Sequence, residues 1–132
     1  MNHKDFVEDL QKIGACSEAV DFVAKNKYDL KQAWNKCERA DWMLWLACKK
    51  EMFTRRDRIH AICDCAETAL KHIPKGEHRP RLAIEAVRVY ADNPTTENLE
   101  RLIVAGAAAG IVAGAAAHKH MCALIRKRLV IK

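Results

Sequence analysis

The stretch TRRDRIHAICDCAETALKHI, residues 54–73, decides the fold class. Its apolar residues recur at intervals of three and four positions, which is the period of one face of an α-helix and not of a strand. They are Ile59, Ile62, Cys63, Ala66, Ala69, Leu70 and Ile73. Thr54 is a suitable N-cap, and Pro74-Lys75-Gly76 breaks the pattern. The stretch therefore predicts an amphipathic helix that buries one face against other helices.

Shorter helices are predicted before this stretch. The apolar spacing favours helices over residues 4–13, from residue 17 and over residues 29–37, and Asp41 is the cap or first-turn acid of a fourth. Gly14 is expected to end the first of these helices, and Ser17 is expected to be the N-cap of the second. No segment keeps a period of two, so no sheet is expected except a frayed strand at residues 129–131. We predict one domain over residues 1–132, an all-α, compact orthogonal bundle of six or seven helices.

The C-terminal part predicts a helix from Arg79-Pro80-Arg81 and a long Ala/Gly-rich helix from Thr96 past Arg126. Residues 102–117 carry no charge. They are fewer than the roughly 20 residues that span a bilayer, so we expect no membrane partner and place this segment at the centre of the bundle. Glycines recur every fourth residue of this segment, at Gly106, Gly110 and Gly114. On a helix they form a smooth strip that allows another helix to pack closely. We prefer a helix of the same chain over a helix of a second copy as that neighbour.

The net charge of +6 is unevenly distributed. Six Lys/Arg stand against two Asp/Glu after residue 92, which suggests an acidic partner, although such a charge also simply aids solubility. Two basic clusters are candidate surfaces for nucleic acid: Arg55, Arg56 and Arg58, then Lys119, Arg126, Lys127 and Arg128. The first cluster lies at a helix N-terminus, where the helix dipole disfavours positive charge, and this small cost hints that the arginines have a function. The second cluster lies at a helix C-terminus, where the dipole favours positive charge. Neither cluster has the interleaved aromatics that stack on single strands.

The six cysteines are read as free thiols in a reducing cytoplasm, because the N-terminus is polar and shows no secretory leader. No Cys-x2-Cys pair exists, so neither a metal nor another cofactor is expected. Four cysteines follow apolar stripes and are predicted in the core: Cys16, Cys37, Cys48 and Cys63. No phosphate loop or nucleophile motif is present, and we therefore expect no enzyme.

The most informative stretch is CERADWMLWL, residues 37–46. Trp42 and Trp45 are three residues apart, so they share a helical face and can anchor a core or an interface. Arg39 and Asp41 are predicted to be too close in sequence to pair with each other. Their expected partners are charges around the Pro80 helix start: Arg79, Arg81 and Glu85. This cluster is either a network that specifies the fold or a partner-binding surface.

These residues resemble a known family. The pattern Ala-Trp-x-x-Cys at residues 33–37, with Arg-x-Asp-Trp-x-Leu-Trp-Leu at 39–46 and Arg-Pro-Arg-x-Ala-Ile-Glu-Ala at 79–86, is similar to bacterial and phage immunity proteins of the Imm5-like type. The similarity covers about residues 15–125. It implies a helical protein that binds and neutralises a toxin encoded beside it. The basic charge departs from the acidic character common among nuclease immunity proteins.

Composition and resemblance together favour a cytoplasmic, non-catalytic protein, a monomer or homodimer, that inhibits another protein. The partner would be a toxin or, for a bacteriophage protein, a host factor. The alternative is a nucleic-acid-binding accessory or regulatory protein that uses the basic clusters at 55–58 and 119–132.

Overall fold

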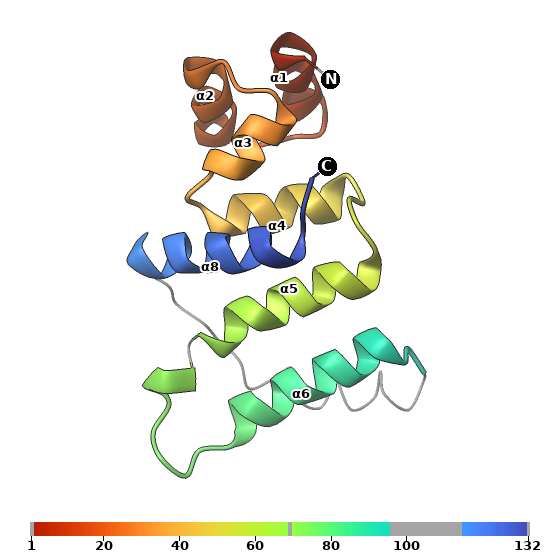
Figure 1. The fold of residues 1–132 in the computed structure, drawn as a ribbon, viewed down its shortest axis with the longest axis vertical. Helices are drawn as coiled ribbons and strands as arrows, with labels where there is room; N and C mark the ends of the chain where they lie inside the picture. The colour runs from red at the N-terminus through yellow and green to blue at the C-terminus, as the bar shows by residue number, and fades with distance from the viewer. Residues whose placement is uncertain (1, 69, 96–114, 132) are drawn as a thin grey trace.

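A computed structural model describes residues 2–68, 70–95 and 115–131, which form seven α-helices and one 3-10 helix (Figure 1). The described residues contain no strand, and this confirms the all-α prediction, with residues 129–131 included. The predicted helix start at Thr96 and the glycine strip lie outside the described residues. The helices are α1 (His3–Lys12), α2 (Ser17–Asn26), α3 (Leu30–Lys36), α4 (Ala40–Lys49), α5 (Arg55–Glu67), η1 (Leu70–His72), α6 (Arg79–Asp92) and α8 (Ala115–Arg128).

Side-chain caps explain where several helices begin. The Asp29 carboxylate accepts from the Gln32 backbone N–H, and the Gln32 side chain accepts from the Asp29 N–H, which is a full capping box. Thr54 caps α5 as predicted. Ser17, however, is the first residue of α2 and the N-cap is Cys16, without a side-chain bond. Asp41 lies in the first turn of α4, whose N-cap is Arg39.

Two helix ends follow from local chemistry. Gly14 has φ +87°, a left-handed conformation that glycine adopts at little cost, and it ends α1 as predicted. Helix α5 stops at Glu67 and not at the predicted Ile73. The Thr68 hydroxyl donates to the Cys65 carbonyl at 2.7 Å, and the Thr68 N–H donates to the same oxygen. This local bonding competes with the continuing helix, and a 3-10 turn follows.

The helices are stacked along the long axis of the molecule (Figure 1). Helices α1, α2 and α3 form one end, α4 and α8 follow, and α5 and α6 lie beyond them. Helix α5 contacts α4, α6 and α8, and α4 also contacts α8. Ala47 and Ala61 are completely buried, and such small side chains let helices approach closely. None of the described helices combines the length and hydropathy that crossing a bilayer requires.

Helix α4 links two apolar cores. Met43 and Ala47 belong to the larger one, which includes Ile125 and Leu129 from the C-terminal part. Leu46 belongs to the smaller one, built from α1, α2 and α3. An ion pair between Lys50 and Asp9 also ties the end of α4 to α1. The two cores therefore meet at α4, the helix that carries Trp42 and Trp45.

Candidate functional site

The structure places a pocket of about 640 Å³ among the first four helices. The connection from α3 to α4 is extended at Cys37 (φ −65°, ψ 137°) and at Arg39 (φ −117°, ψ 102°). This connection redirects α4 beneath α2 and leaves a hollow between them. The pocket is lined by Phe6, Leu10, Gly14, Ala15, Cys16, Ser17, Glu18, Ala19, Phe22, Val23, Ala33, Trp34, Cys37, Arg39, Asp41, Trp42, Met43, Trp45 and Leu46.

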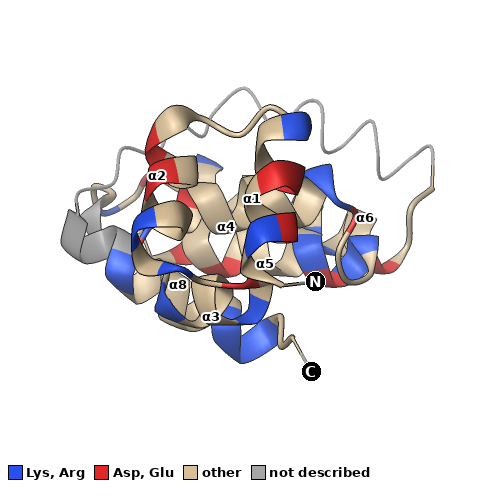
Figure 2. Ribbon diagram, turned by 90° about the horizontal axis from the view of Figure 1, so that it is seen from above, with Lys and Arg blue, Asp and Glu red and all other residues tan. Residues whose placement is uncertain are grey.

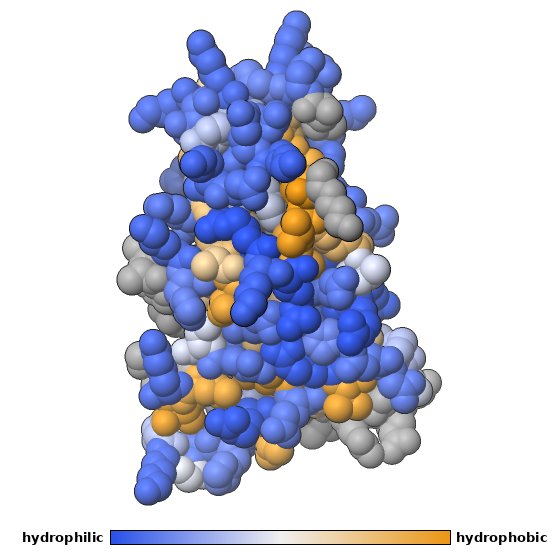
Figure 3. All heavy atoms as spheres, viewed as in Figure 1, coloured by the Kyte–Doolittle hydropathy of each residue, from blue (hydrophilic) through white to orange (hydrophobic). Residues whose placement is uncertain are grey.

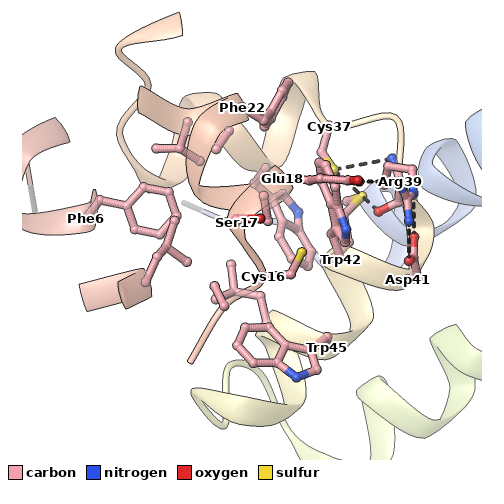
Figure 4. Close-up of a pocket in the computed structure, with 18 of the residues that line it drawn as sticks. Phe6, Cys16, Ser17, Glu18, Phe22, Cys37, Arg39, Asp41, Trp42 and Trp45 are labelled. Carbon is pink, nitrogen blue, oxygen red and sulfur yellow. Dashed lines mark hydrogen bonds and ion pairs between the residues drawn. The ribbon is translucent and has the colours of Figure 1, made fainter. Parts of the chain in front are cut away.

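The lining is mainly apolar and is rich in aromatic rings (Figure 4). Phe6 is buried at one side, while Trp42 is half-buried and Trp45 is 40% exposed. The Phe22 and Trp42 rings lie 5.9 Å apart between centroids. Trp42 and Trp45 therefore both line this pocket, and Trp45 is accessible at the surface. Phe6 and Phe22 were not predicted as site residues, because their spacing alone is that of ordinary core residues.

Arg39 and Asp41 pair with each other at the edge of this pocket. The Arg39 Nε donates to Asp41 Oδ1 at 3.0 Å and the second nitrogen donates to Oδ2 at 2.8 Å. The prediction that they are too close to pair is wrong, because Arg39 precedes the helix in an extended conformation and helical spacing does not apply to it. The Arg39 guanidinium also lies 4.5 Å from the Trp42 ring centroid, a cation–π contact. The pair fixes the Trp42 side of the pocket.

The expected partners on the Pro80 helix lie elsewhere. Arg79 donates to both carboxylate oxygens of Glu77, at 2.8 and 2.6 Å. These hydrogen bonds hold the pKa of Glu77 down at about 2. Arg81 and Glu85 are exposed on α6, and α5 separates α6 from α4 in Figure 1. The predicted network of Arg39 and Asp41 with these residues is not what the structure shows.

The first basic cluster is engaged within the protein. Arg56 Nε binds Asp92 at 2.7 Å, and Arg58 donates to the Ala47 carbonyl at 3.3 Å. The Arg55 guanidinium lies over the Tyr90 ring, 5.6 Å from its centroid. These contacts join α5 to α4 and α6. They explain why arginines stand at an unfavourable end of a helix dipole.

The second basic cluster is largely engaged as well. Arg126 donates to the Cys37 carbonyl at 2.8 Å and to the Trp34 carbonyl at 3.3 Å, which satisfies the C-terminal end of α3. Arg128 binds Asp64 at 2.6 Å. Lys119 lies 3.9 Å from Glu38, a pair of exposed side chains, and Lys127 is exposed.

A polar network between α5 and α6 was not predicted from the sequence. His60 is buried and contacts Asp92 through Nε2 at 2.8 Å, while its Nδ1 accepts from Arg88 at 2.8 Å. Arg88 also donates to Asp64 and Glu67, at 2.9 and 2.7 Å. The signal available was the spacing of His60, Asp64 and Glu67, which forms one polar stripe on the helix.

The prediction for the cysteines is correct for two of the four named. Cys37 and Cys63 are buried, whereas Cys16 and Cys48 are exposed. Cys65 and Cys122 are also buried. The apolar period around Cys48 is ambiguous, since α4 is apolar on most of its circumference. Within the described ranges, no group of three or more His, Cys, Asp or Glu side chains could hold a metal ion.

Comparison with known proteins does not assign the chain to a family. No family model matches the chain, and neither a curated protein nor a solved structure gives a significant match. The similarity to immunity proteins therefore stays a prediction that rests on the motifs at residues 33–46 and 79–86.

Proposed function

We propose that this chain is a non-catalytic binding protein that inhibits another protein by accepting an apolar side chain of its partner in the pocket beside Trp42 and Trp45. The pocket itself is the observation that carries the proposal. Its volume of about 640 Å³ lies in the range of sites that bind ligands or anchor residues. Trp and Arg are the residues most often found at the energetic centre of protein interfaces, and this pocket presents both.

The polar groups at the pocket edge support a protein partner over a polar small-molecule substrate. Arg39 and Asp41 satisfy one another, and no histidine is among the lining residues. Among the described residues, no buried side-chain nitrogen or oxygen lacks a hydrogen-bond partner. The lining therefore provides apolar surface that can bury an apolar side chain. It provides few hydrogen-bonding groups that could orient a polar ligand.

The charge beside the pocket indicates the chemistry of the partner. Glu18 and Asp21 are exposed one turn apart on α2, and residues 17–24 contain no basic side chain (Figure 2). We infer a partner segment with one apolar anchor, aromatic or aliphatic, flanked by Lys or Arg. Arg39 lies 3.9 Å from Glu18 at the same edge. With Asp41 and Asp21 counted as well, three carboxylates face one guanidinium, so the local charge at this surface is negative, opposite to the net charge of the chain.

The observed pairing of the basic side chains disfavours the nucleic-acid alternative. Arg56, Arg58, Arg126 and Arg128 each donate to a carboxylate or a carbonyl of the protein itself. A phosphate would have to compete with these internal acceptors for the same guanidinium groups. The partner is thus proposed to be a toxin encoded beside the chain, as the motif resemblance implies, or a host factor.

Substitution of Trp45 tests the pocket. Trp45→Ala should weaken binding of the partner about 30-fold or more, since interface hot spots lose about 2 kcal/mol or more on truncation. Leu82→Ala is the matched control, because Leu82 is a similarly exposed apolar residue on α6, where apolar patches are visible in Figure 3. It should change the affinity less than about threefold. Calorimetric titration against the purified product of each flanking gene measures both.

Growth assays separate the two kinds of partner. Rescue of cells that express a toxic flanking gene would identify a toxin, and slowed growth of cells that express this chain alone would identify a host factor. Either effect should be lost with Trp45→Ala and kept with Leu82→Ala. Absence of both effects, or an equal loss with the two variants, overturns the proposal.

A further inference from the structure

The rim of the pocket is open, but its floor is closed. Trp45 at the rim is 40% exposed, whereas Trp34 and Cys37, which form the floor, are 2% and 5% exposed. Part of the wall comes from α1 and α2, through residues that include Phe6 and Phe22. A partner side chain therefore meets the rim first, and it reaches the floor only if part of the wall moves.

Helices α1 and α2 form a hairpin, residues 3–26, that is held together more closely than it is held to the rest of the chain. The two helices pack directly against each other. Among the described helices, neither has a comparably extensive contact with α4, α5, α6 or α8. The α1–α2 hairpin lies at one end of the molecule (Figure 1). Weakly attached units of this kind can open locally while the rest of a protein stays folded.

Helix α3, which follows the hairpin, is fixed to the C-terminal part of the chain. The Trp34 indole nitrogen donates to the Leu129 carbonyl at 3.0 Å. Arg126 donates to the carbonyls of Trp34 and Cys37 at 3.3 and 2.8 Å. The pocket floor therefore stays with α4 and α8 if the hairpin moves.

The connection from α2 to α3, residues 27–29, has the properties of a hinge. Lys27 is left-handed, with φ 56° and ψ 38°, and Asp29 is extended, with φ −85° and ψ −178°. The His3 Nδ1 donates to the Tyr28 carbonyl at 2.9 Å, so the start of α1 is held at the same place as the end of α2. Hinges are a few residues at the ends of elements that absorb a change of φ and ψ.

Two ion pairs join the hairpin to α4 on the side of the α1–α2 turn. Asp9 pairs with Lys50, the C-cap of α4, and these side chains are 22% and 21% exposed. Glu18 lies 3.9 Å from Arg39 at the pocket edge, where the side chains are 78% and 43% exposed (Figure 4). The Asp9–Lys50 pair is less accessible to solvent and salt, so it is the stronger of the two attachments.

We propose that the α1–α2 hairpin is a lid that swings about residues 27–29, with the Asp9–Lys50 ion pair as its main latch. Opening separates the two ion pairs and the Phe22–Trp42 contact, whose ring centroids are 5.9 Å apart. It leaves α3 and the larger core in place. The open lid admits the apolar anchor of a protein partner to the pocket floor. This last step rests on the proposed function, whereas the opening is a property of the free chain.

Thiol labelling of the native protein, without any partner, measures the opening. Cys16→Ser/Cys48→Ser removes the two exposed thiols and gives the parent for this experiment. N-ethylmaleimide is added under native conditions, and peptide mapping then gives a separate rate for each cysteine. Cys37 reports on the pocket floor, while Cys63 and Cys65 on α5 do not line the pocket and report on global unfolding.

Substitution of the latch should act on one of these rates. Lys50→Met should raise the rate of Cys37 about tenfold, since it removes a partly buried ion pair. The rates of Cys63 and Cys65 should stay within about twofold of the parent, because the larger core is still closed. Lys49→Met is the matched control, since Lys49 is an exposed neighbour on α4, and it should leave the Cys37 rate as in the parent.

Urea dependence of the parent's rates tests the lid even if Lys50→Met does not fold. Local opening exposes less surface than global unfolding, so the Cys37 rate should rise less steeply with urea than the rates of Cys63 and Cys65. Equal urea slopes for these thiols overturn the lid, as does equal acceleration of all three by Lys50→Met or of Cys37 by Lys50→Met and Lys49→Met. A failed Trp45→Ala binding test would leave these rates unchanged, so the two proposals fail separately.

Discussion

Trp34→Ala is expected to lower the free energy of unfolding by about 4 kcal/mol or more, which would leave the protein marginally folded at best. Trp34 is 2% exposed and packs in the larger core, 5.6 Å from the Phe53 ring between centroids. Truncation of a buried Trp costs about 3–5 kcal/mol. Its indole nitrogen also donates to the Leu129 carbonyl at 3.0 Å, and loss of the donor adds about 1–3 kcal/mol. The total free energy of unfolding of a typical domain is only about 5–15 kcal/mol.

Urea unfolding followed by circular dichroism measures this effect. Trp34→Phe is the partial control, since it keeps most of the packing and removes the hydrogen bond. It should cost about 1–3 kcal/mol. Trp45→Ala, at an exposed position of α4, should cost less than about 1 kcal/mol. An unfolding midpoint of Trp34→Ala equal to that of the parent would contradict the packing of α3 against the C-terminal segment.

Arg88→Met has the second largest expected effect, a loss of about 2–3 kcal/mol. Removing one member of a buried ionic network costs about 3–5 kcal/mol, and the Arg88 side chain is 24% exposed, which reduces the figure. The substitution keeps the aliphatic stem but leaves the Asp64 carboxylate with Arg128 alone and His60 Nδ1 without its donor. Arg79→Met is the control, because the Arg79 side chain is 76% exposed and its substitution should leave the urea midpoint close to that of the parent. Equal destabilisation by the two substitutions would refute a structural role of the network.

The same network predicts the direction of acid unfolding. Burial alone would raise the pKa of Asp64, but hydrogen bonds from Arg128 and Arg88 outweigh it and leave the pKa below the ordinary value. The pKa of Asp92 is lowered chiefly by its hydrogen bond with His60. A carboxylate with a lower pKa in the folded state stabilises the fold above its unfolded pKa, about 4, and this stabilisation is lost as the pH falls through the folded value. Urea midpoints should therefore drop below about pH 4, and less so in Arg88→Met.

The helices could be predicted from the sequence because each apolar stripe and most caps are local signals. Thr54 and Gly14 act where the pattern placed them. The site was predicted in part. The pattern singled out Trp42 and Trp45, because two Trp side chains on one helical face must pack against other parts of the protein or against a partner. The Arg39–Asp41 pair was missed because the conformation before a helix is not periodic. The contacts of Arg88 with α5 were missed because they depend on which helices become neighbours in space.

A nitrogen-15 NMR titration that follows the indole N–H signals of the three tryptophans tests whether the pocket beside Trp42 and Trp45 accepts a protein partner. Addition of the partner should shift or broaden the signals of Trp42 and Trp45. Trp34 also lines the pocket, but it is 2% exposed and its N–H is held by the Leu129 carbonyl, so its signal should change least. Complete binding with all three indole signals unchanged, and shifts confined to α5 and α6, would show that the partner does not bind at this pocket.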